Sequence, residues 1–315
     1  MKILDLHRHA LSLSIAVAML AGCGGAQPPV GAPGTMPPST ALAEQDLLYV
    51  AGGCGGTCVF AYPTGKRVGS LSLSGLGLCS DKHGNIFMPS STSSGQAVVY
   101  EYAHGGTSPF ATLSVPGLLA EGCSVDPTTG NLAVTYLCKN CDYGPVAIFQ
   151  NAQGSPTSYQ ATGVFLSYCG YDNKGNLFAD GMSGSKFVLE ELPKGGSSLT
   201  TVSVNQNIVS AGQVQWDGTY LAIEDLVNPV IYQFKVSGST ATRVGTTHLT
   251  GTGNSASSSW IYAGTVIVPF GQSTNPPKEV GFWKYPAGGA ATKIIKKHIN
   301  ASYLEGATIS LAPHS

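Results

Sequence analysis

"EGCSVDPTTGNLAV", residues 121–134, places a turn between two stretches suited to short strands. Asp126 can accept hydrogen bonds from the turn backbone, and Gly130 can adopt the positive φ that a tight hairpin needs. The same arrangement recurs as "DKHGN" at 81–85, as "DNKGN" at 172–176 and, shortened, as "DGTY" at 217–220. These turns mark a repeat of about 45 residues, which is the length of a propeller blade.

A second set of turns has the same period and indicates how many strands each repeat contains. Strand-like stretches that end in a glycine turn occur at 59–65, 98–105, 146–154, 187–195, 230–238 and 280–288. Each is followed by a further polar stretch with β-branched residues, so a repeat holds four strands. Four short strands in a repeat of this length are typical of one blade of a β-propeller.

The two ends of the domain contain complementary parts of one repeat. "LLYVAGG" at 47–53 has the pattern of a second strand, and "EGATISL" at 305–311 has the pattern of a first strand. Because an open ring would expose unpaired backbone edges, we expect these two strands to pair. The sequence therefore predicts an all-β fold, a six-bladed β-propeller of four-stranded antiparallel blades, closed by the C-terminal strand joining the N-terminal blade. A linear β-solenoid is the alternative, but it requires no split repeat.

The composition is that of a globular β protein with little net charge. The 315 residues are 43% hydrophobic and 10% charged, they include 41 glycines, and the formal net charge is −1. This balance argues against a nucleic-acid partner, which requires a basic surface, and against an acidic disordered chain. We expect a monomer that binds no nucleic acid.

The amino-terminal segment has the organisation of an export signal. Lys2 and Arg8 precede an apolar run at 10–20, which is too short to cross a hydrocarbon core of about 30 Å. The run leads into Leu20-Ala21-Gly22-Cys23, which resembles a bacterial lipobox. The resemblance implies that the Cys23 thiol receives a diacylglyceryl group and that cleavage makes Cys23 the first residue. An ordinary cleavage site with an accidental cysteine is the alternative.

The segment after Cys23 separates the expected lipid anchor from the folded part. Residues 24–44 are rich in Pro, Gly and Ala and lack a strand pattern, which predicts an extended tether. We divide the chain into a lipoprotein signal peptide at 1–22, the lipidated cysteine and tether at 23–45, and the propeller at 46–315. The expected location is the bacterial cell envelope. By analogy with Gram-negative lipoproteins, Gly24 favours the outer membrane.

The repeat resembles the six-bladed NHL, YVTN and SMP-30-like propeller group, whose inner strands also end in an Asp-x-x-Gly-Asn turn. The motifs "EYAHGGTSP" (101–109), "GCSVDPTTGNLAV" (122–134) and "GYDNKGNLF" (170–178) look closest to those of uncharacterised bacterial propeller lipoproteins. The resemblance covers about residues 46–311. It implies the fold, but such turns are shared across unrelated functions, so it implies no activity.

Four cysteines form two closely spaced pairs. Export places them where disulfides can persist, and we predict one disulfide between Cys54 and Cys58 and another between Cys138 and Cys141. A redox pair in "CKNC" is an alternative, but no thioredoxin-like βαβ context surrounds it. A zinc site from the same four thiols would require the two loops to meet.

The other candidate reactive residues form no catalytic set. Cys79, Cys123 and Cys169 lie in expected inner strands, shortly before the turn Asp, and we predict that they are buried free thiols. The histidines of the domain occur singly in turns and strand ends, so we expect surface histidines without a metal-ligand spacing or a general-base role. One Asp per turn does not supply the several carboxylates that calcium needs. We predict no catalytic residue, no metal site and no cofactor.

Binding is expected on the face that carries the longer loops, such as 89–96 and 138–145, because loops on a rigid scaffold usually carry recognition. Five residues near the entry of the inner strands could approach the central channel: Glu121, Tyr168, Gln213, Trp260 and Glu305.

Three functions follow from these features. The first is a noncatalytic binding or scaffold module, held on the membrane by its lipid anchor, with a protein or glycan partner in the envelope. The second is an SMP-30/gluconolactonase-like metal-dependent hydrolase, which holds calcium with Glu, Asn and Asp side chains. Here the inner strands offer Cys, Ser, Gly and Trp more than carboxylates, so those ligands cannot be carried over by position. The third is a structural envelope module without a ligand.

Overall fold

The computed structural model describes residues 40–139, 141, 143–252, 256–271, 278–297, 299, 301 and 303–313. All of them belong to the compact unit Pro33–Ser315. The predicted signal peptide, Cys23 and most of the predicted tether lie outside these ranges. Within them, the helical elements are α1 (Thr40–Ala43) and the 3₁₀ turn η1 (Gln150–Ala152), and no helix is long and apolar enough to span a membrane.

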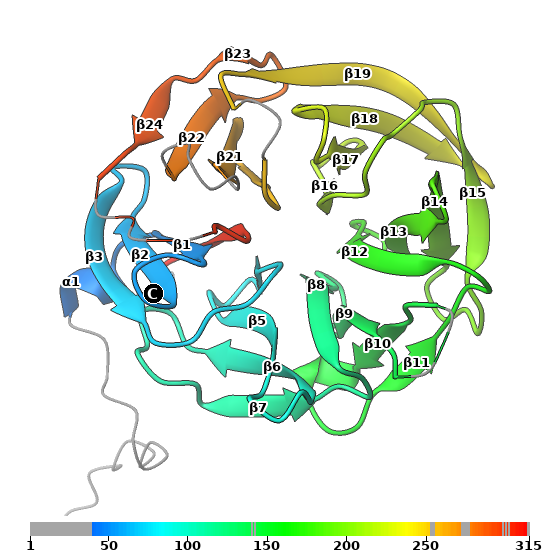
Figure 1. Cartoon of the computed structure of the whole chain (residues 1–315), viewed down its shortest axis with the longest axis horizontal. Helices are drawn as coiled ribbons and strands as arrows, with labels where there is room; N and C mark the ends of the chain where they lie inside the picture. The colour runs from blue at the N-terminus through cyan, green and yellow to red at the C-terminus, as the bar shows by residue number, and fades with distance from the viewer. Residues whose placement is uncertain are drawn as a thin grey trace, which may run out of the picture. The chain divides into compact units, whose positions relative to one another are not determined.

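The described chain is all-β, and its antiparallel sheets surround a common centre as in a β-propeller (Figure 1). Four sheets contain four strands each. The first is β25 (Ala307–Ser310), β1 (Leu47–Ala51), β2 (Thr57–Ala61) and β3 (Lys66–Leu71); the second is β4 (Cys79–Ser80), β5 (Ile86–Ser91), β6 (Ala97–Tyr102) and β7 (Ala111–Ser114). The third is β8 (Leu119–Val125), β9 (Leu132–Leu137), β10 (Val146–Phe149) and β11 (Thr157–Tyr159); the last is β20 (Trp260–Tyr262), β21 (Thr265–Phe270), β22 (Glu279–Lys284) and β24 (Lys293–Ile295).

The remaining sheet has nine strands and joins two antiparallel runs of four. One run is β12 (Phe165–Tyr171), β13 (Leu177–Ser183), β14 (Lys186–Leu192) and β15 (Thr200–Val204); the other is β16 (Val214–Trp216), β17 (Leu221–Asp225), β18 (Val230–Ser237) and β19 (Thr240–Thr250). The ninth strand, β23 (Gly289–Ala290), pairs with β19.

The sequence predicted six four-stranded blades, and the described strands form four four-stranded sheets and one nine-stranded sheet. The two runs merge because the outer strands β15 and β19 pair in parallel, with Ser203 opposite Thr240 and Val204 opposite Ala241. β19 is 11 residues long, and its far end also pairs with β23. The free edge of an outer strand presents unpaired backbone groups, and here neighbouring outer strands satisfy part of that edge.

The ring is closed by strands that are far apart in the sequence. β25 pairs antiparallel with β1, with Leu47 opposite Ser310 and Val50 opposite Ala307. Every residue of both strands is buried. The expected pairing of the head strand with the tail strand is observed.

A buried histidine lies at this seam. His104 is 6% exposed; its Nε2 lies 2.9 Å from the Leu42 carbonyl oxygen, and its Nδ1 lies 2.6 Å from Ser310 Oγ. Burial lowers the pKa of His104, although hydrogen bonding to the Leu42 carbonyl opposes that shift. The expectation of surface histidines is wrong for His104, because it joins the segment before β1 to the strand that closes the ring.

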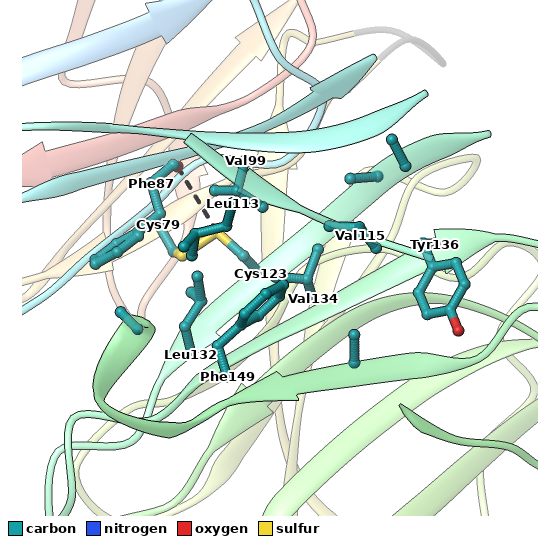
Figure 2. Packing of buried hydrophobic residues seen from close by; sticks show 14 residues of the cluster. Cys79, Phe87, Val99, Leu113, Val115, Cys123, Leu132, Val134, Tyr136 and Phe149 are labelled. Carbon is teal, nitrogen blue, oxygen red and sulfur yellow. Dashed lines mark hydrogen bonds between the residues drawn. A yellow bond between two sulfur atoms is a disulfide. The ribbon is translucent and has the colours of Figure 1, made fainter. Parts of the chain in front are cut away.

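The apolar core lies between neighbouring sheets rather than on one side of each. Figure 2 shows one such contact, in which Phe87 of β5 and Leu132 of β9 belong to the same buried cluster. A sheet covered on both faces reads as a nearly continuous apolar run, as β1 does. Outer strands such as β3 and β7 carry exposed residues instead. The inner strands are consequently held rigidly at the centre of the ring.

Candidate functional site

The residues predicted to approach the centre lie where the inner strands begin. Glu121 is in β8, Tyr168 in β12 and Trp260 in β20, while Gln213 directly precedes β16 and Glu305 precedes β25 by two positions. Figure 1 shows these strands around the centre of the ring. Gln213 is buried, and the other four residues are partly exposed.

Tyr168 is surrounded by acidic groups that come from several sheets. Burial is the leading cause that raises the pKa of its hydroxyl, and the negative charges of four carboxylates add to it: Glu121, Glu224, Asp180 and Glu305. The Tyr168 ring also reaches the segment before β4, where a Cβ on Gly77 would lie 3.5 Å from its Cε1. The Tyr168 hydroxyl therefore keeps its proton and can act as a hydrogen-bond donor at neutral pH.

The same carboxylates have raised pKa values. Burial raises the pKa of Glu121 and of Glu224 to about 7, and it raises the pKa of Glu305 and, much more strongly, that of Asp180. Removal of water disfavours the charged form of a carboxyl group. No basic residue in the described ranges is among the causes that shift these four pKa values. The centre of the ring therefore changes its charge near neutral pH.

Three polar side chains join neighbouring strands around this centre. Thr135, Asp180 and Glu224 are each the fourth residue of their strand, in β9, β13 and β17, and all three are fully buried. Thr135 Oγ1 donates to the Ser167 carbonyl at 2.6 Å. Asp180 Oδ2 accepts from the Gly212 N–H at 3.2 Å, and Glu224 Oε2 accepts from the Ser259 N–H at 3.0 Å. Each bond ties one four-strand run to the start of the next.

These joining residues were absent from the sequence prediction, although a signal existed. The strands read "LAVT", "LFAD" and "LAIE", so one polar residue follows three apolar residues at the same place in successive repeats. A carboxyl group in a strand that is otherwise buried needs a hydrogen-bond partner. Glu224 satisfies this requirement with one oxygen, while its Oε1 is buried without a partner among the described residues.

Two of the residues predicted to approach the centre, Gln213 and Trp260, make contacts within the fold. Gln213 Oε1 accepts from the Ser258 hydroxyl at 2.7 Å, which links two segments that precede inner strands. Trp260 packs against two apolar clusters, one around Phe87 and Leu132 and one around Leu48 and Phe282. Glu121, Tyr168 and Glu305 remain as the predicted residues whose charges interact at the centre.

The closely spaced cysteines are paired within their loops. Cys54 forms a disulfide with Cys58 between β1 and β2, and Cys138 forms one with Cys141 between β9 and β10. These are the pairs that the spacing predicted.

The prediction of free thiols in the inner strands is wrong for Cys79 and Cys123, which form a disulfide between β4 and β8 (Figure 2). Cys79 lies two residues before Asp81 and Cys123 three residues before Asp126, so the two side chains point to opposite faces of their sheets and meet across the contact. Cys169 of β12 is free and buried. Burial, followed by the charge of Asp180, raises the pKa of the Cys169 thiol well above its ordinary value, so the nucleophilic thiolate is scarce.

The repeated Asp residues organise the turns at the other end of the inner strands. Asp81 Oδ1 accepts from the backbone N–H groups of His83 and Asn85, each at 2.8 Å, and Asp172 makes the equivalent bonds to Lys174 and Asn176. Within the described ranges, no group of three or more His, Cys, Asp or Glu residues is arranged to hold a metal ion.

Comparisons with known proteins support the fold and leave the activity open. No family model matches the chain, and no curated protein matches it. A chain of the nidogen–laminin complex is similar, with a TM-score of 0.66 and 14% identity, over 85% of this chain and 100% of that one. A candidate 6-phosphogluconolactonase from Bacteroides fragilis NCTC 9343 is similar with a TM-score of 0.51 and 12% identity, over 83% of this chain and 84% of that one. The second has a propeller-type fold, in agreement with the sheets described above.

Proposed function

We propose that the protein is a noncatalytic binding or scaffold module of the bacterial cell envelope. In this proposal Cys23 carries the lipid that holds it on a membrane, the outer membrane in a Gram-negative cell, and residues 24–45 form the tether. The domain is a monomer without a cofactor or a nucleic-acid ligand. Its recognition surface is the end of the ring where the inner strands begin, and its partner is a protein or a glycan.

The observation that carries this proposal is the set of partly exposed acidic groups at that end. Glu121 and Glu305 flank Tyr168, and no basic residue in the described ranges offsets their charge. Glu121 and Tyr168 lie in inner strands and Glu305 lies just before one, so the scaffold restricts all three, which lowers the entropy that binding must remove. Such a site suits a partner that presents ammonium, amide or hydroxyl donors.

We also propose a finer description of the fold. Each antiparallel run of the nine-stranded sheet has the same four-strand order as the separate sheets, so the two runs count as two of six blades. A ring of six blades would be consistent with the NHL, YVTN and SMP-30-like group. The parallel β15–β19 pairing is then a contact between blades.

Site-specific photocrosslinking in cells would test the proposed recognition surface. A photoreactive phenylalanine would replace Leu118, which is 43% exposed beside Glu121, or Lys82, an exposed residue in the opposite turn. We expect a discrete adduct from position 118, at least tenfold less of it from position 82, and a similar loss when Glu121→Gln and Glu305→Gln are combined. Equal amounts of adduct at the two positions would contradict the proposal. An amount that is the same with and without the glutamine substitutions would contradict it too.

A separate experiment tests the membrane anchor. The Cys23→Ser chain should lose its lipid mass in spectrometry of the purified protein and move from the membrane pellet to the soluble fraction. A Cys23→Ser chain that stays in the pellet would contradict the anchor while leaving the recognition surface intact.

A lactone hydrolase is the second candidate function, favoured by the pKa of Glu121. A carboxyl group with a pKa of about 7 suits proton transfer at neutral pH. The purified chain would be assayed with a gluconolactone, with and without added calcium. Hydrolysis above the spontaneous rate that disappears in Glu121→Gln would replace the binding proposal with this one.

A further inference from the structure

Two grooves adjoin at the turn end of the inner strands, opposite the recognition surface proposed above. One has a volume of about 680 Å³ and lies between the strands ending at Trp216 and Tyr262. The other has a volume of about 550 Å³ and is bordered by Asp172 and Lys235. Trp216 and Tyr220 line both grooves. Both volumes fall within the usual range of small-ligand sites, which is about 300–1,000 Å³.

Trp216 differs from the other two tryptophans of the chain. Trp283 is fully buried and Trp260 packs against two apolar clusters, whereas Trp216 belongs to none of the clusters that the described residues form and is partly exposed. Its Nε1 is buried without a hydrogen-bond partner among those residues. An unpaired buried donor lowers the free energy of unfolding by about 1–3 kcal/mol, so the Trp216 N–H does not stabilise the fold.

The polar part of the larger groove is organised around Asp217. Its Oδ2 accepts from the Tyr285 hydroxyl at 2.7 Å and from Gln233 Nε2 at 3.0 Å, and its Oδ1 accepts from the N–H groups of Thr219 and Tyr220. The Tyr285 hydroxyl donates its one hydrogen bond to Asp217, so the lone pairs of its oxygen can accept a bond from a ligand hydroxyl. Fixed acceptors beside flat aromatic rings are what a sugar needs, because a sugar has an apolar C–H face and a polar rim.

The charge of the two grooves excludes a strongly charged ligand. Asp217 is the one charged residue that lines the larger groove in the described chain, and its oxygens are already hydrogen-bonded. In the smaller groove, Asp172 and Glu191 are balanced by Lys174 and Lys235. A phosphate or a nucleic acid would find no net attraction here.

We infer that these two grooves bind a neutral oligosaccharide, with one sugar in each groove and Trp216 between them. This inference is independent of the proposed function, since it uses the other end of the inner strands. A ligand with two linked sugars should bind more tightly than a single sugar, because the second contact forms at a high effective concentration.

Tryptophan fluorescence of the full chain provides the test, in a detergent that contains no sugar. The probes are the tetrasaccharides of N-acetylglucosamine, β-1,4-glucose and α-1,4-glucose, with the corresponding monosaccharides. We expect at least one tetrasaccharide to change the emission, with an affinity at least tenfold above that of its monosaccharide. Trp216→Leu should remove the response, and Tyr285→Phe should weaken binding about threefold to tenfold in calorimetry. Circular dichroism checks that both variants fold.

Matched changes separate this site from the other end of the ring. Tyr303→Leu removes a tyrosine that is 52% exposed before β25 and should leave binding unchanged. Glu121→Gln should also leave it unchanged; binding lost in Glu121→Gln would move the ligand to the first surface and overturn the inference. No binding of any probe, unchanged binding in Trp216→Leu, or displacement by a proline-rich peptide of residues 24–44 would each overturn it as well.

Discussion

The two halves of the ring are joined in different ways at corresponding positions. In β9, β13 and β17 the fourth residue is polar, and its side chain bonds to the start of the next run. In β1, β5 and β21 the fourth residue is Val50, Pro89 and Val268, which offer no such bond. All six positions are buried, so the difference lies in chemistry rather than in exposure.

The apolar half is joined by backbone hydrogen bonds, by a covalent bond and by hydroxyl groups at other positions, such as Ser80 Oγ, which donates to the Ile309 carbonyl at 2.7 Å. The Ala307 N–H donates to the Ser258 carbonyl at 3.1 Å, and the Gly77 N–H donates to the Glu121 carbonyl at 2.7 Å. The disulfide between Cys79 and Cys123 lies beside the second of these bonds. At the fourth strand position the apolar half therefore has no ionisable group, whereas Asp180 and Glu224 make two of the three polar contacts depend on protonation. The ionisable group at the closing seam is His104, whose Nδ1 lies 2.6 Å from Ser310 Oγ.

The largest effect is expected where the apolar half is closed by β25. Truncation after Gly306 removes four buried residues and leaves the edge of β1 unpaired. We expect loss of the cooperative thermal transition and aggregation in size-exclusion chromatography. Truncation after Leu311 keeps β25 and is the control. A monomeric product of the shorter chain with an unchanged melting temperature would show that closure is unnecessary.

Removal of the disulfide between Cys79 and Cys123 is expected to have the next largest effect on stability. Replacing Cys79 and Cys123 by Ala removes a link across 44 residues, for which chain entropy predicts a loss of about 4 kcal/mol in the free energy of unfolding. The matched control replaces Cys54 and Cys58, which are 4 residues apart, and should lose about 2 kcal/mol. Urea unfolding measures both. Equal losses would mean that the loop length does not control the effect.

Of the three polar side chains that bond to the start of the next run, Asp180 is expected to contribute most to the free energy of unfolding. Asp180→Leu leaves the N–H groups of Tyr168 and Gly212 without their acceptor, and two unpaired groups should lower the free energy of unfolding by about 2–4 kcal/mol. Asp180→Asn keeps one oxygen and should lose less than half of that amount. Urea unfolding at pH 7 compares them. If the leucine variant is as stable as the asparagine variant, the hydrogen bonds that Asp180 accepts contribute nothing to the free energy of unfolding.

The sequence predicts the repeat and the closing strand because both depend on local signals. The turn residues and the apolar stretches between them are visible one repeat at a time, and β1 with β25 completes the pattern. The β15–β19 pairing is not visible in this way. It depends on where the edges of two outer strands come to lie in space, and "TTVSV" and "TATRVGTTHLT" carry no mark of it.

The prediction of free thiols failed for Cys79 and Cys123, and the reason lies in their positions within the repeat. Cys123 and Cys169 lie three residues before their turn Asp, whereas Cys79 lies two residues before Asp81, and successive residues of a strand point to opposite faces of the sheet. Cys79 and Cys123 therefore face each other across the contact between adjacent sheets, whereas Cys169 points, as Cys123 does, towards the preceding sheet and stays free. The central carboxylates were found in part, since Glu121 and Glu305 lie near the entry of inner strands, but Asp180 and Glu224 lie within second strands, from which the sequence analysis predicted no central residue.

The smallest expected effect is a pH dependence of stability, which arises in the half of the ring that contains Asp180 and Glu224. The pKa of Glu224 is about 7 in the folded protein and near 4.5 in the unfolded chain, so folding binds a proton between these values. Its contribution to stability is complete below pH 4.5 and is lost as the pH rises through 7. The slope of the unfolding free energy should change by up to about 1.4 kcal/mol per pH unit in this window.

Glu224→Gln should therefore flatten the fall in stability between pH 5 and 7, measured by urea unfolding at several pH values. Glu101 and Glu121, whose pKa values burial also raises to about 7, keep part of the slope in either variant. Thr135→Val is the matched control: it removes a joint at the same strand position but no titratable group, so its curve should lie lower and run parallel to that of the unmodified protein. A Glu224→Gln curve that is also parallel would mean that the protonation of this joint is the same in the folded and unfolded chains.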